Sequence, residues 1–188
     1  MKIGVYGSAA GEMGASIQEK ARAIGMEIAR RGHVVVTGAC PGFPQDAVLG
    51  AQERHGKVIG FSPGVDVQDH VKRFKFPTEG ITEFVFVPKS FKHVNNELAC
   101  KKYRNVSSVA EADAAILIGG RIGTMNEFTI AYDLGKLIGI LEGSGGITTR
   151  IIPMLLEDAK KASASRIVFE KDPAKLVQKL VEWHDAQK

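Results

Sequence analysis

The chain has 188 residues, of which 44% are apolar and 24% charged, and its formal net charge is +4 at pH 7. This length suits one core, so we expect a single domain over residues 1–188. Lysine and arginine are scattered without a polybasic run, and no apolar run approaches the roughly 20 residues of a spanning helix. We therefore expect neither a nucleic acid nor a membrane as a partner.

The cysteines and the first residues indicate where the protein acts. Cys40 and Cys100 lie far apart and have no second cysteine at metal-ligand spacing, which is typical of free thiols in a reducing compartment. The first residues run directly into an apolar strand and show no signal peptide. We predict a cytoplasmic protein.

Short apolar strands alternate with longer helices along the chain. A strand at residues 2–6 precedes a helix at 16–31, a strand at 33–37, a helix at 47–55 and a strand at 57–61. After a strand at 83–87 come a helix at 95–110, a strand at 114–118, a helix at 124–134 and a strand at 137–141. A helix at 148–162, a strand at 166–169 and a helix at 172–186 complete the series.

The strands are apolar throughout rather than at every second residue, which indicates that both faces are buried in a parallel sheet. The alternation predicts an α/β fold: one doubly wound, Rossmann-like sheet of about seven strands with helices on both faces. Residues 62–82 fit this pattern least well. Their Pro63-Gly64 pair and isolated phenylalanines predict a long excursion, either a lid or an element that packs at the sheet edge.

Glycine-rich turns follow four of the predicted strands. They lie at residues 7–11, 38–42, 119–123 and 143–146. Glycine lets backbone N–H groups approach a ligand, and the helix that follows adds partial positive charge. Because ligands bind at the carboxyl ends of the strands in such sheets, these turns predict an anion-binding cleft. Simple tight turns remain the alternative at Gly11 and at 143–146.

The turn at residues 119–124 carries the strongest signal. A buried strand runs into Gly119 and Gly120, and Gly123 and Thr124 follow at the predicted helix start. Thr124 can cap this helix or donate to a phosphate oxygen. The turn lacks the Gly-Lys-Ser/Thr ending of ATPases, and the G-x-G-x-x-G dinucleotide pattern does not fit it.

Glu127 lies three residues after Thr124 and therefore on the same side of the helix. A carboxylate near a helix start can simply complement the dipole. However, Glu127 borders an apolar stripe of Phe128, Ala131 and Leu134, so we expect it to face the cleft.

These residues resemble a known family. The stretch Ile118-Gly119-Gly120-x-x-Gly123-Thr124-x-x-Glu127 is similar to the signature P-G-G-x-G-T-x-x-E of the LONELY GUY (LOG) family. Arg104 stands nine residues before Asp113, the spacing of the family's active-site arginine before its Ala-Asp-Ala strand entry. The resemblance extends over roughly residues 2 to 142. Older labels of such sequences as lysine decarboxylases find no support, because nothing resembles the Schiff-base lysine site of a pyridoxal enzyme.

The resemblance implies a Rossmann-like homodimer, or a higher homo-oligomer, that binds a nucleotide-like phosphate and, in enzymatic members, hydrolyses the N-glycosidic bond of a nucleoside 5′-monophosphate. Arg104 and Glu127 are then the catalytic residues. The expected phosphate and ligand-binding residues, taken from the signature and the other glycine turns, are Gly7, Ser8, Gly38, Gly119, Gly120, Arg121, Gly123 and Thr124. We expect no cofactor, and the five histidines lie singly, so no metal site is expected.

Three departures from the hydrolase pattern keep a second function open. Ile118 replaces the leading proline, Asn105 replaces the basic residue after the arginine, and Arg121 stands inside the glycine turn. These features resemble a sister group that includes the molybdenum-cofactor carrier proteins. The alternative function is therefore a non-catalytic carrier of a nucleotide-like phosphate such as molybdenum cofactor.

Overall fold

The computed structural model describes residues 1–10, 14–158 and 161–187. Within these residues, seven strands pair in parallel in the order β4-β3-β2-β1-β5-β6-β7. Their bounds are Lys2–Gly7 (β1), Val34–Thr37 (β2), Val58–Phe61 (β3), Glu83–Val85 (β4), Ala114–Ile118 (β5), Leu137–Leu141 (β6) and Arg166–Glu170 (β7). The predicted α/β class and the parallel sheet are confirmed.

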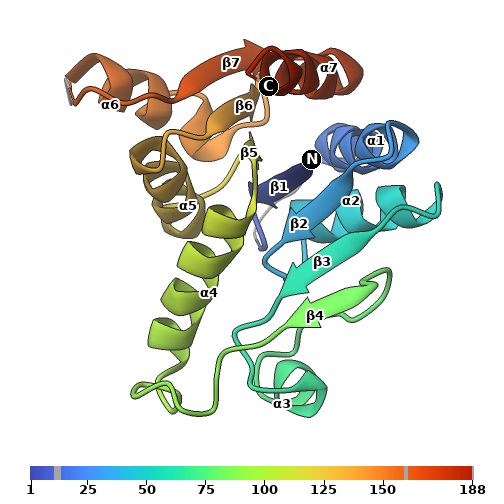
Figure 1. Cartoon of the computed structure of the whole chain (residues 1–188), viewed down its shortest axis with the longest axis vertical. Coiled ribbons are helices and arrows are strands. Elements are labelled where there is room, and N and C mark those ends of the chain that lie inside the picture. The colour runs from blue at the N-terminus through green and yellow to red at the C-terminus, as the bar shows by residue number, and fades with distance from the viewer. Residues whose placement is uncertain (11–13, 159–160, 188) are drawn as a thin grey trace.

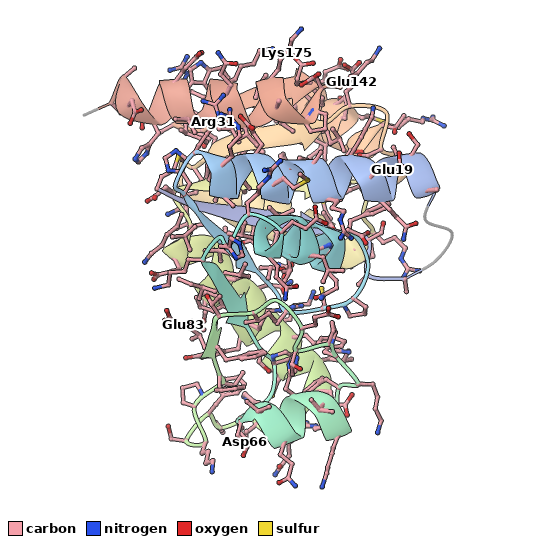
Figure 2. The ribbon with its side chains drawn as sticks, turned by 90° about the vertical axis from the view of Figure 1, so that its right-hand side faces the viewer. Glu19, Arg31, Asp66, Glu83, Glu142 and Lys175 are labelled. Atoms are coloured by element: carbon pink, nitrogen blue, oxygen red, sulfur yellow. The ribbon has the colours of Figure 1, made fainter. Side chains whose placement is uncertain are left out.

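Helices cover both faces of this sheet (Figure 1). On one face lie α1 (Ala15–Arg30), α2 (Phe43–Gln52) and α7 (Pro173–Asp185), which Figure 2 views from outside. The other face carries α4 (Glu97–Glu111), α5 (Ile122–Asp133) and α6 (Ile151–Asp158). The short α3 (Val67–Lys72) lies beside the edge strand β4, and a 3-10 turn, η1 (Gly146–Thr148), precedes α6. The sheet is therefore doubly wound, as predicted.

The central strand β5 shows why the strands are apolar throughout. Ala114, Ile116 and Ile118 pack into the core beneath α1, α2 and α7, whereas Ala115 and Leu117 pack into the core beneath α4, α5 and α6. Each fully buried isoleucine or leucine contributes roughly 1.5–3 kcal/mol relative to an exposed one. Successive residues therefore stabilise opposite layers.

Several helix bounds differ from the prediction. The helix α5 begins at Ile122 rather than Thr124, and Leu134, placed in its apolar stripe, is 50% exposed at its C-terminal end. The helix predicted at 148–162 is divided into η1 and α6, and residues 161–162 are not helical. Residues 159–160 of that prediction lie outside the described residues, as does Gly11 of the first glycine turn.

Residues 62–82 pack at the sheet edge. His70 is fully buried, and its Nε2 donates to the Pro77 carbonyl oxygen at 2.9 Å. The other ring nitrogen then accepts from the Ser62 hydroxyl, also at 2.9 Å. Phe74 packs with Val87 and Cys100. Of the two alternatives from the sequence, the edge-packing element matches this arrangement.

Candidate functional site

The sheet order reverses between β1 and β5. From β1 the chain builds outward through β2 and β3 to β4, and then α4 returns it to β5 on the other side of β1. Loops at the carboxyl ends of such a pair diverge and leave space for a ligand. The turns after β1, β2 and β5 meet at this point, so three glycine-rich segments lie close together.

The turn after β5 is held by serine side chains from two other loops. Gly119 N–H donates to Ser144 Oγ at 2.8 Å, and Gly120 N–H donates to Ser8 Oγ at 2.9 Å. The side chain of Thr124 packs against the Gly120 α-carbon, and Gly120 has φ +92°, so a larger residue does not fit there. The amides of both Gly119 and Gly120 therefore have acceptors within the protein.

The N-terminus of α5 is open. Its N-cap residue, Arg121, makes no side-chain capping hydrogen bond. Thr124 does not cap the helix either, because the helix begins two residues before it; that alternative was wrong. Thr124 is instead buried. In the part of the chain that the structure describes, no side chain accepts from the first-turn N–H groups of Ile122, Gly123 and Thr124, and the helix dipole adds partial positive charge.

A cavity of about 160 Å³ lies at this helix N-terminus and is named here the phosphate cavity. Its lining combines the end of β1, the turns after β1, β2 and β5, and residues of α4 and α5. They are Gly7, Ser8, Ala9, Cys40, Arg104, Arg121, Gly123, Thr124 and Glu127. Seven residues expected at the site from the sequence thus meet around one space, whereas Gly38, Gly119 and Gly120 support its walls.

Arg104 reaches this cavity from the middle of α4. It is only 8% exposed, and its Nη1 donates to the carbonyl oxygen of Gly38 at the end of β2. The guanidinium crosses so close to the Gly38 α-carbon that any side chain at position 38 would displace it. Because Gly38 has no side chain, it leaves the space that the Arg104 guanidinium occupies. The Nε atom of Arg104 is buried without a hydrogen-bond partner among the described residues.

Glu127 is 6% exposed and carries no counter-ion in direct contact among the described residues. Burial raises its pKa from 4.5 to about 7, while the positive charges of Arg104 and Lys102 act in the opposite direction. A carboxyl group with this pKa exchanges its proton near neutral pH, which is what general acid–base catalysis requires.

Two residues near the site were not among the site residues expected from the sequence. Cys40 lines the phosphate cavity, and burial raises the pKa of its thiol, which keeps it protonated. Ser144 holds Gly119 in place and also donates to the Leu141 carbonyl oxygen at 2.6 Å. Only their positions in glycine-rich turns pointed toward the site.

Asn105 follows Arg104 on α4 and connects this helix to α5. Its Nδ2 donates to Asn126 Oδ1 at 3.0 Å, next to Glu127 in sequence. Its own side-chain oxygen is buried without a partner among the described residues. At this position the protein therefore has a neutral contact between two helices rather than a second positive charge.

The described residues contain no group of three or more histidine, cysteine, aspartate or glutamate side chains placed to hold a metal ion. Within the same part of the chain, no helix has the length and apolar character needed to cross a membrane.

Comparisons with known proteins agree on a family and a fold. The sequence model of the SLOG cluster4 family matches residues 1–177. An uncharacterized protein of Archaeoglobus fulgidus is 29% identical over 143 residues, which cover 76% of this chain and 80% of that protein.

Two solved structures share the fold over nearly their whole length. The structural-genomics target TM1055 superposes with a TM-score of 0.76 at 23% identity, covering 97% of this chain and 98% of the other. The molybdenum cofactor carrier protein of Chlamydomonas reinhardtii superposes with a TM-score of 0.70 at 18% identity, covering 98% of each chain. At these identities the likeness establishes the fold alone.

Proposed function

Because the chain belongs to the SLOG cluster4 family, a LOG-like family, we propose that it binds a nucleotide-like phosphate ester and hydrolyses the N-glycosidic bond of a nucleoside 5′-monophosphate. One observation carries this proposal: the phosphate cavity combines an uncapped helix N-terminus with Arg104 and a buried Glu127 whose pKa is about 7.

The phosphate is proposed to bind at the N-terminus of α5. Anions are stabilised there by free N–H groups and the helix dipole. Thr124 adds a hydroxyl that lines the cavity. Ser8 Oγ accepts from Gly120 N–H, so its own hydrogen remains free to donate to a phosphate oxygen. Arg121, which also lines the cavity, adds positive charge.

Hydrolysis at this site requires a water, a proton acceptor and a departing base. As the bond between C1′ and the base nitrogen breaks, its electron pair leaves with the base and positive charge develops on the sugar. The water oxygen bonds to C1′, and Glu127 takes the proton that this water releases. The same carboxyl can then return the proton to the base nitrogen, so hydroxyl and hydrogen balance across the two products. Arg104 orients the substrate through its planar guanidinium.

The second candidate function is a carrier that binds such a phosphate without hydrolysing it. Asn105 favours this alternative, because its contact with Asn126 replaces the positive charge expected beside Arg104 in the hydrolases. The similar fold of a protein named as a molybdenum cofactor carrier also supports it.

Incubation with a panel of nucleoside 5′-monophosphates distinguishes the two functions. Free base is followed by chromatography for the wild type and for Glu127→Gln. Hydrolysis predicts base release by the wild type and its loss in the variant. Binding without release favours the carrier. Base release that survives Glu127→Gln would reject the mechanism.

We further propose a cytoplasmic homodimer. Support for assembly comes from α4, where Leu98 and Val106 are 71% and 52% exposed beside a hollow lined by Phe91 and Tyr103. The free, buried state of both cysteines is compatible with a reducing compartment. Light scattering on the wild type and on Val106→Asp tests the assembly: a dimer that the aspartate dissociates supports it, and a monomeric wild type rejects it.

A further inference from the structure

The two proposed catalytic residues stand on different helices. Arg104 belongs to α4 and Glu127 to α5, and both line the phosphate cavity. Among the described residues no ion pair joins their side chains. The two helices pack against each other on the same face of the sheet (Figure 1). The distance between the guanidinium and the carboxyl therefore depends on how α4 is placed against α5.

A side-chain hydrogen bond links the two helices beside the cavity. Asn105 Nδ2 donates to Asn126 Oδ1 at 3.0 Å. Asn105 is the immediate neighbour of Arg104 in the chain, and Asn126 is the immediate neighbour of Glu127. Neither asparagine belongs to the lining of the phosphate cavity. Both therefore lie behind the residues that do, where they support them without touching a ligand.

This contact is not the most stable solution for a buried position. Asn105 is 3% exposed, and its Oδ1 is buried without a partner among the described residues. An unpaired buried acceptor lowers stability, and an apolar side chain of similar shape would avoid that cost. A buried asparagine between helices can instead select one register at the expense of stability. The amide is thus better explained by the placement of the helices than by the stability of the fold.

Each asparagine is also held through its carbonyl oxygen. Ser108 Oγ donates to the Asn105 carbonyl at 3.2 Å, and Thr129 Oγ1 donates to the Asn126 carbonyl at 3.0 Å. Both of these hydrogen bonds stay within one helix. They therefore provide a control, because removing one of them changes a helix without breaking its link to the other.

We infer that Asn105 and Asn126 are positioning residues, whose hydrogen bond sets the separation between the Arg104 guanidinium and the Glu127 carboxyl. The role rests on the proposed function, in which these two groups act together on the substrate. It adds to that function a pair of side chains that act only through their neighbours.

The first test measures base release from the nucleoside 5′-monophosphate that the wild type hydrolyses fastest. Asn105→Leu and Asn126→Leu each break the link. Each should lower kcat about 100-fold, because a misplacement of about 1 Å in a catalytic group can cost that factor. KM should stay near its wild-type value, since the phosphate is proposed to bind at the N-terminus of α5. The double variant should be no slower than either single variant, whereas independent effects would multiply to about 10,000-fold.

Stability separates positioning from a structural role. A residue that only holds the fold together would lower kcat and the free energy of unfolding in parallel. Asn105→Leu removes the unpaired acceptor, so it should retain at least the wild-type free energy of unfolding in urea while kcat falls. If Asn105→Leu does not fold, the partly exposed Asn126 offers the second variant for both measurements.

A second test needs no hydrolysis, because the pKa of Glu127 reports on its surroundings. The titratable and charged groups around this carboxyl come from several elements: Arg104 and Lys102 of α4, Tyr6 of β1, Cys40 of the turn after β2 and Arg121 at the start of α5. Burial raises the pKa of Tyr6 and of Cys40, so both stay neutral near pH 7. Arg104 is the buried cation among these groups.

The measurement compares each protein with its Glu127→Gln form in urea across neutral pH. The stability that the carboxyl loses as pH rises should level off above its folded-state pKa, which is about 7 in the wild type. Arg104 holds this pKa down, against the effect of burial. In Asn105→Leu the guanidinium is no longer held near the carboxyl, and leucine still excludes water. The levelling off should therefore move to higher pH.

Thr129→Val is the matched control. It removes a hydroxyl that bonds only within α5, so kcat and the pH of levelling off should both match the wild type. A kcat that both asparagine variants leave unchanged, a double variant slowed by the product of the single effects, or a levelling off that stays near pH 7 would each overturn the positioning role. Absence of base release by the wild type would reject hydrolysis alone, and the pH measurement would then decide the positioning role by itself.

Discussion

Replacing Glu127 by glutamine should make the protein more stable at alkaline pH. The carboxyl is buried, and its pKa in the folded protein is about 7 against an ordinary value of 4.5. The folded state therefore binds the proton more tightly than the unfolded state, and stability falls as pH rises from about 4.5 through about 7. Each pKa unit corresponds to about 1.4 kcal/mol, so the ionised carboxylate costs about 3 kcal/mol at pH 8.

Glutamine has nearly the same shape as the protonated acid and does not ionise. We expect Glu127→Gln to exceed the wild type in free energy of unfolding by about 3 kcal/mol at pH 8 and by less than about 1 kcal/mol at pH 5. Urea denaturation at both pH values measures this difference. Glu142→Gln is the matched control, because Glu142 is exposed at the surface (Figure 2), and it should show no such trend.

A difference that is the same at both pH values, or a variant less stable than the wild type at pH 8, would refute the reasoning. The second result would mean that the attraction between Glu127 and Arg104 outweighs the cost of burial. The expected result would instead indicate that this carboxylate is retained at the expense of stability, as is common for residues selected for activity.

Three further outcomes follow from buried side-chain contacts in the structure. Gly38→Ala should displace the Arg104 guanidinium and lower the kcat/KM of base release about 100-fold, because a misplacement of about 1 Å in a catalytic group can cost that factor. An unchanged rate in the chromatographic assay would contradict the placement. Ser144→Ala should leave the Gly119 amide without its acceptor and reduce the free energy of unfolding in urea by about 1–3 kcal/mol, and no reduction would show that water replaces the hydroxyl. Burial lowers the pKa of His70, so the unfolded chain takes up its proton first and stability should fall below about pH 6.5. His70→Asn should lessen the loss in urea stability between pH 7 and pH 5, and an identical loss would assign it to other groups.

The strands and their direction could be predicted from the sequence because their cause is local. Both faces of β5 are buried, so every residue from Ala114 to Ile118 is apolar and the run is visible without any partner. The convergence of the glycine turns followed from the same fact, since the carboxyl ends of parallel strands share one edge.

The site's supporting contacts could not be predicted, because they join residues far apart in the chain. Ser8 accepts from Gly120 across 112 positions, and Arg104 donates to Gly38 across 66. No local pattern shows that the amides of Gly119 and Gly120 are already occupied. The start of α5 was missed for a different reason: Ile122 is 79% exposed and offers neither a polar cap nor a buried stripe.

The placement of β1 between β2 and β5 has a consequence for the growing polypeptide. Strands β1 to β4 are complete once residue 85 has left the ribosome, and they can pair with one another while the second edge of β1 stays unpaired. Only when residues 114–133 emerge do β5 and α5 cover that edge and bring Thr124 and Glu127 against Ser8. The phosphate cavity is therefore created only after α5 has been synthesised, and a nascent chain that can bind at this position has already closed the centre of its sheet.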